Sequence, residues 1–173
     1  MRPTSCQLRI GIVLAGLLAL LGVSTLDDTG PWFVLNETRS VPTGLYWLDR
    51  GEQVDVGDLI WFEVPPSVAE LVHERGYIPP GGKLLKRIVA AEGERWCVHS
   101  DLSFVVAKAR HGVAFLSDVH GKPLKPIDGC SIVPPGHVLV AGDHPRSFDS
   151  RYFGAIPIHS VIGEARPVWI SSH

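Results

Sequence analysis

The sequence has few cysteines and no excess of positive charge, and both shortages exclude broad classes of protein. Three cysteines among 173 residues are too few for a small scaffold held together by disulfides, and no Cys-x-x-Cys pair indicates a zinc site. Sixteen Lys and Arg against 18 Asp and Glu leave a net charge of −2, so no basic surplus exists to neutralise the phosphates of a nucleic acid. We therefore expect no nucleic-acid partner, no metal and no cofactor.

One long apolar run stands near the N-terminus. Residues 10–26 carry no charge, and as a helix they would reach about 25 Å, close to the apolar thickness of a bilayer. Two arginines precede the run and two aspartates follow it, which favours a cytoplasmic N-terminus. We expect a cytoplasmic segment over 1–9, a transmembrane anchor over 10–26 and an exported domain over 27–173. A signal peptide cleaved near Gly22-Val23-Ser24 is the alternative.

Short apolar runs between turn residues follow, which is typical of a mainly β domain. Eighteen glycines and 14 prolines, scattered rather than repeated, provide the turns that such a domain needs. One helix is expected from Pro65 to Gly76, with an apolar stripe of Val68, Leu71 and Val72. Residues 98–136 are less regular and are expected to form an excursion from the main sheet. The strands are expected at 44–49, 59–64, 84–91, 137–141 and 161–170.

Two cysteines, Cys97 and Cys130, bracket that excursion. Outside the cytoplasm they can oxidise, and a disulfide would close a loop of about 34 residues, for which chain entropy suggests about 4 kcal/mol of stabilisation. Two unconnected buried thiols are the alternative. Cys6 lies across the membrane in the expected topology, so it cannot join the pair.

Ser40 is a candidate nucleophile in the segment N-E-T-R-S-V-P-T-G-L-Y, residues 36–46. A residue before proline is held extended, so the backbone around Ser40 is expected to be rigid. A nucleophilic serine needs that rigidity together with a base and with donors for the oxyanion. Taken alone, the segment is a weak signal and is more typical of a turn serine without chemistry.

Lys86 is the candidate base, in the run K-L-L-K-R-I-V-A-A-E-G. Alternate residues of a strand share a face, so Lys86 points the same way as the apolar Leu84 and Ile88. Burial among apolar side chains lowers the pKa of an ammonium group, and a lysine poised near neutrality can take the proton of a serine hydroxyl. A lysine that snorkels from an edge strand is the alternative.

Hydrogen-bonding groups crowd the loop A-G-D-H-P-R-S-F-D-S-R-Y-F-G, residues 141–154. Asp149 and Arg151 are close enough in sequence to pair and brace this loop, and Ser147 can donate to a neutral amine. Such loops often shape sites on a rigid scaffold, although a purely structural Asp–Arg turn is also compatible. The composition also allows a Ser-His-Asp triad, but the sequence contains no G-x-S-x-G nucleophile elbow that would favour one.

Taken together and in this order, the anchor and three boxes resemble the bacterial type I signal peptidase superfamily. The boxes are S-x-P-x-G-L-Y from Ser40, K-R-I-V-A-A-E-G-E from Lys86 and G-D-H-x-x-S-x-D-S-R from Gly142. The form S-V-P-T-G-L-Y is most similar to the conjugative-transfer signal peptidases of the TraF type. The chain departs at Glu94, where Asp is commoner, and at His144-Pro145, where Asn and Arg are frequent. The resemblance implies a small antiparallel coiled-sheet domain behind an N-terminal transmembrane helix.

The same resemblance implies a Ser/Lys dyad, with Ser40 as the nucleophile and Lys86 as its base. A hydroxyl that assists the oxyanion, a hydroxyl that orients the lysine amine and an acid–base pair support the dyad in the family. The matching positions are Thr38, Ser147, Asp149 and Arg151.

A function follows from the resemblance as an expectation. It is a membrane-anchored serine endopeptidase on the periplasmic side of the bacterial inner membrane, cleaving exported precursors, such as a pilin or conjugative-transfer protein, after small residues. Its partners would be precursors with signal-peptide-like cleavage sites and membrane lipid. Two alternatives stay open: a non-catalytic membrane-anchored component of a pilus or secretion assembly, and a transferase that passes the acyl-enzyme to an amine and cyclises a pilin.

Overall fold

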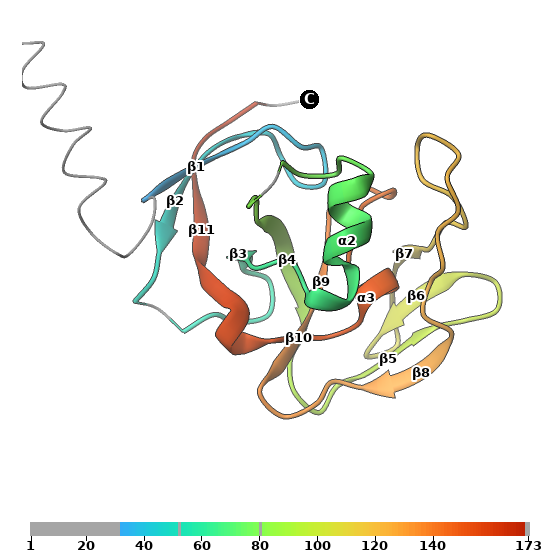
Figure 1. Ribbon diagram of the computed structural model, residues 1–173. Helices are drawn as coiled ribbons and strands as arrows, with labels where there is room; N and C mark the ends of the chain where they lie inside the picture. Colours follow the sequence, from blue (N-terminus) through green and yellow to red (C-terminus); the bar gives the residue numbers. More distant parts are fainter. Residues whose placement is uncertain (1–31, 52, 80, 172–173) are drawn as a thin grey trace, which may run out of the picture. The chain divides into compact units, whose positions relative to one another are not determined.

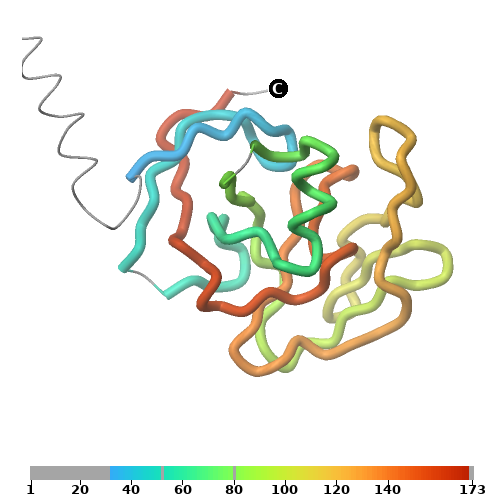
Figure 2. Tube along the Cα trace, viewed as in Figure 1, coloured from blue at the N-terminus to red at the C-terminus, as the bar shows by residue number. Residues whose placement is uncertain are grey.

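The computed structural model describes residues 32–51, 53–79 and 81–171 (Figures 1 and 2). The chain divides into two compact units, Met1–Phe33 and Val34–His173, and the second carries the fold. The predicted anchor at 10–26 lies outside the described residues. Within the described ranges, no helix is long and apolar enough to cross a membrane.

The larger of two sheets has seven strands in the order β1-β2-β11-β3-β4-β9-β10. The last strand, β11, pairs antiparallel with β3 near its start and with β2 over the rest of its length, so one long strand joins the two halves of the sheet. The sheet curls around its own core between its two edge strands, β1 and β10, which agrees with the predicted antiparallel coiled sheet (Figure 1). The strands are β1 (Phe33–Asn36), β2 (Gly44–Asp49), β3 (Leu59–Phe62), β4 (Leu84–Ala90), β9 (His137–Ala141), β10 (Ile156–Pro157) and β11 (Val161–Ile170).

Strand β4 is central and is buried on both faces. It pairs antiparallel with β3 on one side and with β9 on the other. Leu84 and Ile88 belong to one core cluster, and Leu85 belongs to another, so the predicted alternation of faces is confirmed. The strand that carries Lys86 is thus held by hydrogen bonds along both edges.

Helix α2 (Pro66–Glu74) lies where the sequence predicts a helix. Pro66 is its first residue, a position at which the missing N–H has no helical partner to lose. Val72 is fully buried and packs in the same core cluster as Leu84 and Ile88, so α2 covers that face of the larger sheet (Figure 1). Past its end, Gly76 takes a φ of 66°, which suits glycine and turns the chain back toward β4.

The segment 98–136 is more regular than the sequence suggests, and that expectation is wrong in part. It contributes three strands that join β5 in a four-stranded sheet of order β7-β6-β5-β8, drawn in yellow-green to orange in Figure 1. These strands have only four or five residues, and β8 is exposed along its whole length, so no alternation of apolar and polar residues marks it. Their bounds are β5 (Arg95–Val98), β6 (Ser103–Val106), β7 (Ala109–Val113) and β8 (Gly129–Ile132).

Candidate active site

Apolar packing brings the loop that carries Ser40 against β4. Ser40 lies between β1 and β2, and its neighbour Val41 is 2% exposed. Val41 shares a core cluster with Leu85, the chain neighbour of Lys86. The two flanking residues are thus buried in one apolar cluster, which holds the Ser40 loop close to β4.

The predicted pair does meet. Lys86 Nζ donates a hydrogen bond of 2.7 Å to Ser40 Oγ, across 46 positions of sequence. Lys86 is 4% exposed, whereas Ser40 is half-buried and open to solvent on one side. A neutral amine at this distance can accept the serine proton, which is the geometric requirement for a general base.

Burial sets the protonation of Lys86. Loss of hydration is the largest effect and lowers its pKa from 10.5 to about 8. The negative charge of Asp149 opposes this shift, while the positive charge of Arg151 adds to it and Asp143 opposes it again. Among the described residues, no carboxylate lies within ion-pair distance of Lys86. The side chain is therefore a lysine that reaches its neutral form near physiological pH.

Thr38 lies beside Ser40, as the resemblance implies, and its partner Asn36 is a residue that the sequence analysis missed. Thr38 Oγ1 is 3.3 Å from Ser40 Oγ and donates to Asn36 Oδ1 over 2.8 Å. Asn36 is 7% exposed at the end of β1 and also accepts the backbone N–H of Thr38 over 3.1 Å. An Asn two residues before a hydroxyl residue is a frequent turn signal, and this signal could have identified it.

The loop after β9 is braced by Asp149 and Arg151, as predicted. Both are buried, and the guanidinium donates to both carboxylate oxygens, from Nε over 2.7 Å and from Nη2 over 2.6 Å. Arg151 also donates to the carbonyls of Val113, Pro145 and Ser147. This pair thus fixes the path of the loop and ties it to β7.

Helix α3 (Ser150–Phe153) begins in the same loop. Asp149 caps it by accepting the N–H of Arg151, and its Oδ2 accepts the N–H of Gly142 over 2.9 Å. One carboxylate therefore closes the loop at both ends.

Ser147 lines the same cavity as Ser40 and Lys86, but its hydroxyl does not make the predicted contact with the lysine amine. Its hydroxyl is buried and has no hydrogen-bond partner among the described residues, so no bond to Lys86 is formed. A side chain at Gly142 would overlap Ser147 Oγ and would come 2.7 Å from the Ser40 carbonyl oxygen. Ser147 Oγ and the Ser40 carbonyl oxygen therefore both lie where a side chain at Gly142 would stand. The role of Ser147 toward the lysine amine stays a prediction.

No histidine side chain within the described ranges hydrogen-bonds the Ser40 hydroxyl. His144, which lies within the last box, has an exposed side chain whose Nδ1 accepts the backbone N–H of Arg146 over 3.1 Å. Its backbone N–H donates to the Ser40 carbonyl over 3.1 Å. The geometry gives the serine a lysine neighbour and leaves the Ser-His-Asp alternative without support.

A cavity of about 670 Å³ opens beside Ser40 and Lys86. One wall comes from the chain after α2 and another from a loop at 114–124, and these two are tied together across the cavity. Asp118 accepts the Tyr77 hydroxyl over 2.6 Å and Arg75 Nη1 over 3.4 Å. Apolar side chains in the lining include Trp61, Ile78, Leu85, Phe115, Val119, Leu124, Phe148 and Tyr152.

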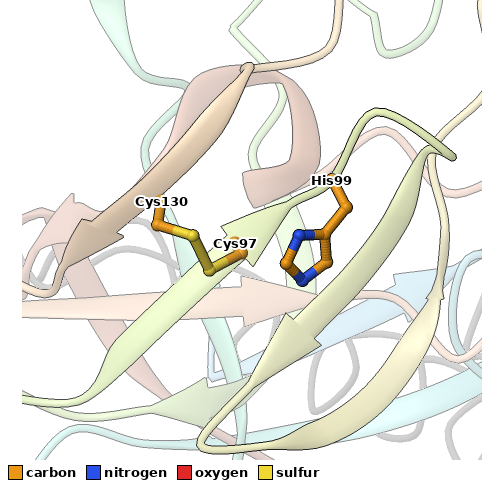
Figure 3. A group of neighbouring side chains, drawn as sticks. All are labelled: Cys97, His99 and Cys130. Carbon is orange, nitrogen blue, oxygen red and sulfur yellow. A yellow bond between two sulfur atoms is a disulfide. The ribbon is translucent and has the colours of Figure 1, made fainter.

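Cys97 and Cys130 are joined by a disulfide and lie directly opposite one another on β5 and β8. Figure 3 shows His99 beside them, and a ligand atom of each of the three residues lies within 4.8 Å of the others. Cysteine binds zinc as a thiolate, and the disulfide removes both thiolates. In its oxidised form this group offers one imidazole and is not a metal site.

Comparison with known proteins agrees with this arrangement. Residues 10–170 match the family model of signal peptidase, peptidase S26. The conjugal transfer protein TraF of Agrobacterium tumefaciens is 33% identical over 91% of this chain and 94% of its own length. A probable thylakoidal processing peptidase 2 of Arabidopsis thaliana is 31% identical over 76% of this chain and 37% of its own length.

Among solved structures, the chain is similar to a signal peptidase I from Enterococcus faecalis, at 26% identity and a TM-score of 0.38, over 65% of this chain and 97% of that one. A plasmid transfer protein TraF of Escherichia coli is 33% identical over 78% of this chain and 81% of its own length. Since the family model spans nearly the whole chain, this protein belongs to the signal peptidase family, peptidase S26.

Proposed function

We propose that this chain is a membrane-anchored serine endopeptidase that cleaves exported precursors after small residues, with Ser40 as nucleophile and Lys86 as general base. The hydrogen bond between Lys86 Nζ and Ser40 Oγ carries the proposal. The low pKa of the buried amine supports it, because a lysine near neutrality can take and return a proton at working pH.

The proposed reaction begins with the neutral form of Lys86. Ser40 Oγ attacks the carbonyl carbon of the scissile bond while its proton passes to Lys86 Nζ. The tetrahedral oxyanion is met by the Ser40 N–H and the Thr38 hydroxyl, a donor of this kind being worth roughly 3 kcal/mol at comparable sites. The protonated amine then donates to the leaving nitrogen, and the peptide bond breaks to leave an acyl-enzyme on Ser40.

Release of the acyl group needs a second nucleophile. Lys86, neutral again, takes a proton from water, and the hydroxide equivalent attacks the ester to give a carboxylic acid and free Ser40. An amine in the place of water would give an amide, which is the transfer that cyclises a chain. Both paths share the acyl-enzyme, and the acceptor alone separates them.

The cavity beside the pair is suited to an extended peptide. Its lining is largely apolar, and Ser40 and Lys86 open into it. β1 is an edge strand of the sheet, and an extended peptide can add to such an edge as a further strand. Relatives named as conjugal and plasmid transfer proteins support a precursor used in conjugation, a pilin among them.

Location is part of the proposal. An anchor at 10–26 with residues 1–9 in the cytoplasm would hold the peptidase domain at 27–173 on the periplasmic face of the inner membrane, where exported precursors emerge. Protease added to intact spheroplasts should then digest the domain. Protection until the cells are lysed would mean that the orientation is the reverse.

Processing of a precursor by three variants tests the chemistry. The full-length protein in detergent micelles is mixed with a synthetic peptide that has alanine at −1 and −3 of the cleaved bond. Ser40→Ala and Lys86→Ala should abolish cleavage, whereas His144→Ala should retain most of it. Cleavage by folded Lys86→Ala, or its loss in folded His144→Ala, would refute the dyad. Mass spectrometry of the products separates the free acid from a cyclised chain.

A further inference from the structure

Asn36 is a buried amide whose polar atoms all face the loop that carries Ser40. Its Nδ2 donates to three backbone carbonyls, those of Thr38 over 2.9 Å, Val41 over 3.2 Å and Pro42 over 2.9 Å. Its Oδ1 accepts both the backbone N–H and the hydroxyl of Thr38. One side chain therefore spans the loop from the residue two before the nucleophile to the residue two after it.

These bonds determine where the proton of Thr38 points. An amide oxygen only accepts, so Thr38 must spend its single hydroxyl proton on Asn36 Oδ1. Toward Ser40, Thr38 then presents a lone pair at 3.3 Å. When Lys86 is protonated, it donates to Ser40. The serine then donates its own proton to Thr38, so the chain of hydrogen bonds runs from Lys86 through Ser40 and Thr38 to the acceptor Asn36.

Loss of the Lys86 proton changes that order. The Ser40 proton turns to Lys86 Nζ, and Thr38 Oγ1 is released from its role as acceptor. Once an oxyanion forms, a full negative charge competes with the neutral Asn36 oxygen for the Thr38 proton, and charge-assisted hydrogen bonds are the stronger kind. The hydroxyl then turns from Asn36 to the oxyanion, which is a contact made in the transition state and not before it.

We propose that Asn36 is a positioning residue for this reaction. It holds the Ser40 loop in its reactive conformation, and it holds the Thr38 hydroxyl in place until that hydroxyl donates a hydrogen bond to the oxyanion. The inference rests on the proposed function, since it assigns a task within the same site. Asn36 acts through Thr38 and the loop backbone, and it does not itself contact the reacting atoms.

Two substitutions separate the parts of this role. Asn36→Asp keeps the size and an acceptor oxygen but loses all donation to the three carbonyls, and its charge holds the Thr38 proton more firmly than an amide does. Asn36→Ala removes donors and acceptor together. Ser103→Ala is the matched control, because Ser103 is another buried polar residue, 6% exposed. Ser103 is the first residue of β6 in the smaller sheet, and its hydroxyl donates to Asp101.

The experiment measures kcat and KM for the alanine-containing peptide with full-length protein, and thermal melting reports the fold. We expect kcat to fall by about tenfold to a hundredfold in both Asn36 variants, with KM changed by less than about threefold, because misplacement of a reacting group costs rate. Ser103→Ala should keep both constants. In a Thr38→Val background, Asn36→Asp should lower kcat less than it does alone, since the Thr38 proton is gone and only the lost donation to the three carbonyls remains.

An unchanged kcat in either folded variant would overturn the proposal, as would an undiminished effect of Asn36→Asp in the Thr38→Val background. If Asn36→Ala does not fold, the isosteric Asn36→Asp decides alone. Failure of the proposed function looks different. In that case Ser40→Ala itself continues to cleave, whereas an inactive Ser40→Ala together with a fully active Asn36→Asp rejects only the positioning role.

Discussion

Lys86 and Arg87 are chain neighbours on β4 with opposite electrostatic surroundings. Arg87 donates from Nε and Nη2 to the two oxygens of Asp143, each over 3.1 Å, and from Nη1 to the Gly57 carbonyl. Lys86, on the other face, donates to a neutral hydroxyl. Because a strand sends consecutive side chains to opposite faces, one cation stays paired and charged while the other can lose its proton.

The rate of peptide cleavage should therefore rise with pH through a midpoint near 8, as Lys86 becomes neutral. Below that midpoint the neutral fraction, and with it kcat/KM, should fall roughly tenfold per pH unit. His144→Ala should keep the same midpoint. A midpoint near the ordinary histidine value of about 6.5 would point to a histidine base.

Substitution of the base should also stabilise the fold in a pH-dependent way. The unfolded lysine keeps its proton up to about pH 10.5 and the folded one up to about 8, so stability of the wild type rises with pH between those values. Lys86→Met removes the buried charge, and we expect it to be more stable at pH 7 by about 1–3 kcal/mol, with the difference shrinking above pH 8. Urea unfolding at several pH values measures this, and a difference independent of pH would contradict it.

Loss of the Cys97–Cys130 disulfide should weaken the fold more than the chemistry. The bridge closes a span of 33 residues within the smaller sheet, whereas Ser40 lies on a loop of the larger sheet and Lys86 on its strand β4. The Cys97→Ala/Cys130→Ala double variant should lose about 2–4 kcal/mol of stability and should keep most of its kcat at 25 °C. Mass spectrometry of non-reduced peptides checks the bridge itself, and two free thiols in exported protein would remove the claim.

Much of the larger sheet could be predicted, because its strands show their burial in the sequence. The bounds of β2, β9 and β11 are those expected from apolar runs between turns, and the face taken by Lys86 follows from alternation alone. β8 could not be predicted, since a short exposed strand carries no periodic signal.

The candidate site likewise contains residues that the sequence predicts and residues whose roles it does not. Ser40, Lys86 and the Asp149–Arg151 pair follow from residue types and resemblance. A turn signal marks Asn36, but its proposed role could not be predicted, because that role depends on carbonyls that reach the side chain only after the loop folds. The unmet hydroxyl of Ser147 likewise depends on distances between side chains, which no pattern in the sequence fixes.

Gly142 should be irreplaceable for reasons of space. A Cβ there would overlap Ser147 Oγ and lie 2.7 Å from the Ser40 carbonyl oxygen, so Gly142→Ala must displace the loop of the nucleophile, the serine beside it, or both. A shift of about 1 Å in a reacting group can cost a hundredfold in rate, and we expect a loss of kcat of that order in a folded protein.

The matched control for Gly142 is Gly51→Ala, whose added Cβ would meet nothing closer than an Asp49 oxygen at 3.9 Å. Peptide cleavage and thermal melting measured together distinguish displacement of Ser40 from global unfolding. Adding Ser147→Gly to Gly142→Ala removes the overlap with Ser147 but leaves the one with Ser40. Activity should stay low in that double variant, because the remaining overlap falls on the backbone carbonyl of Ser40 and displaces the loop that carries the nucleophile. Full activity in Gly142→Ala would contradict the prediction, because it would show that the Ser40 loop can shift without a loss of rate.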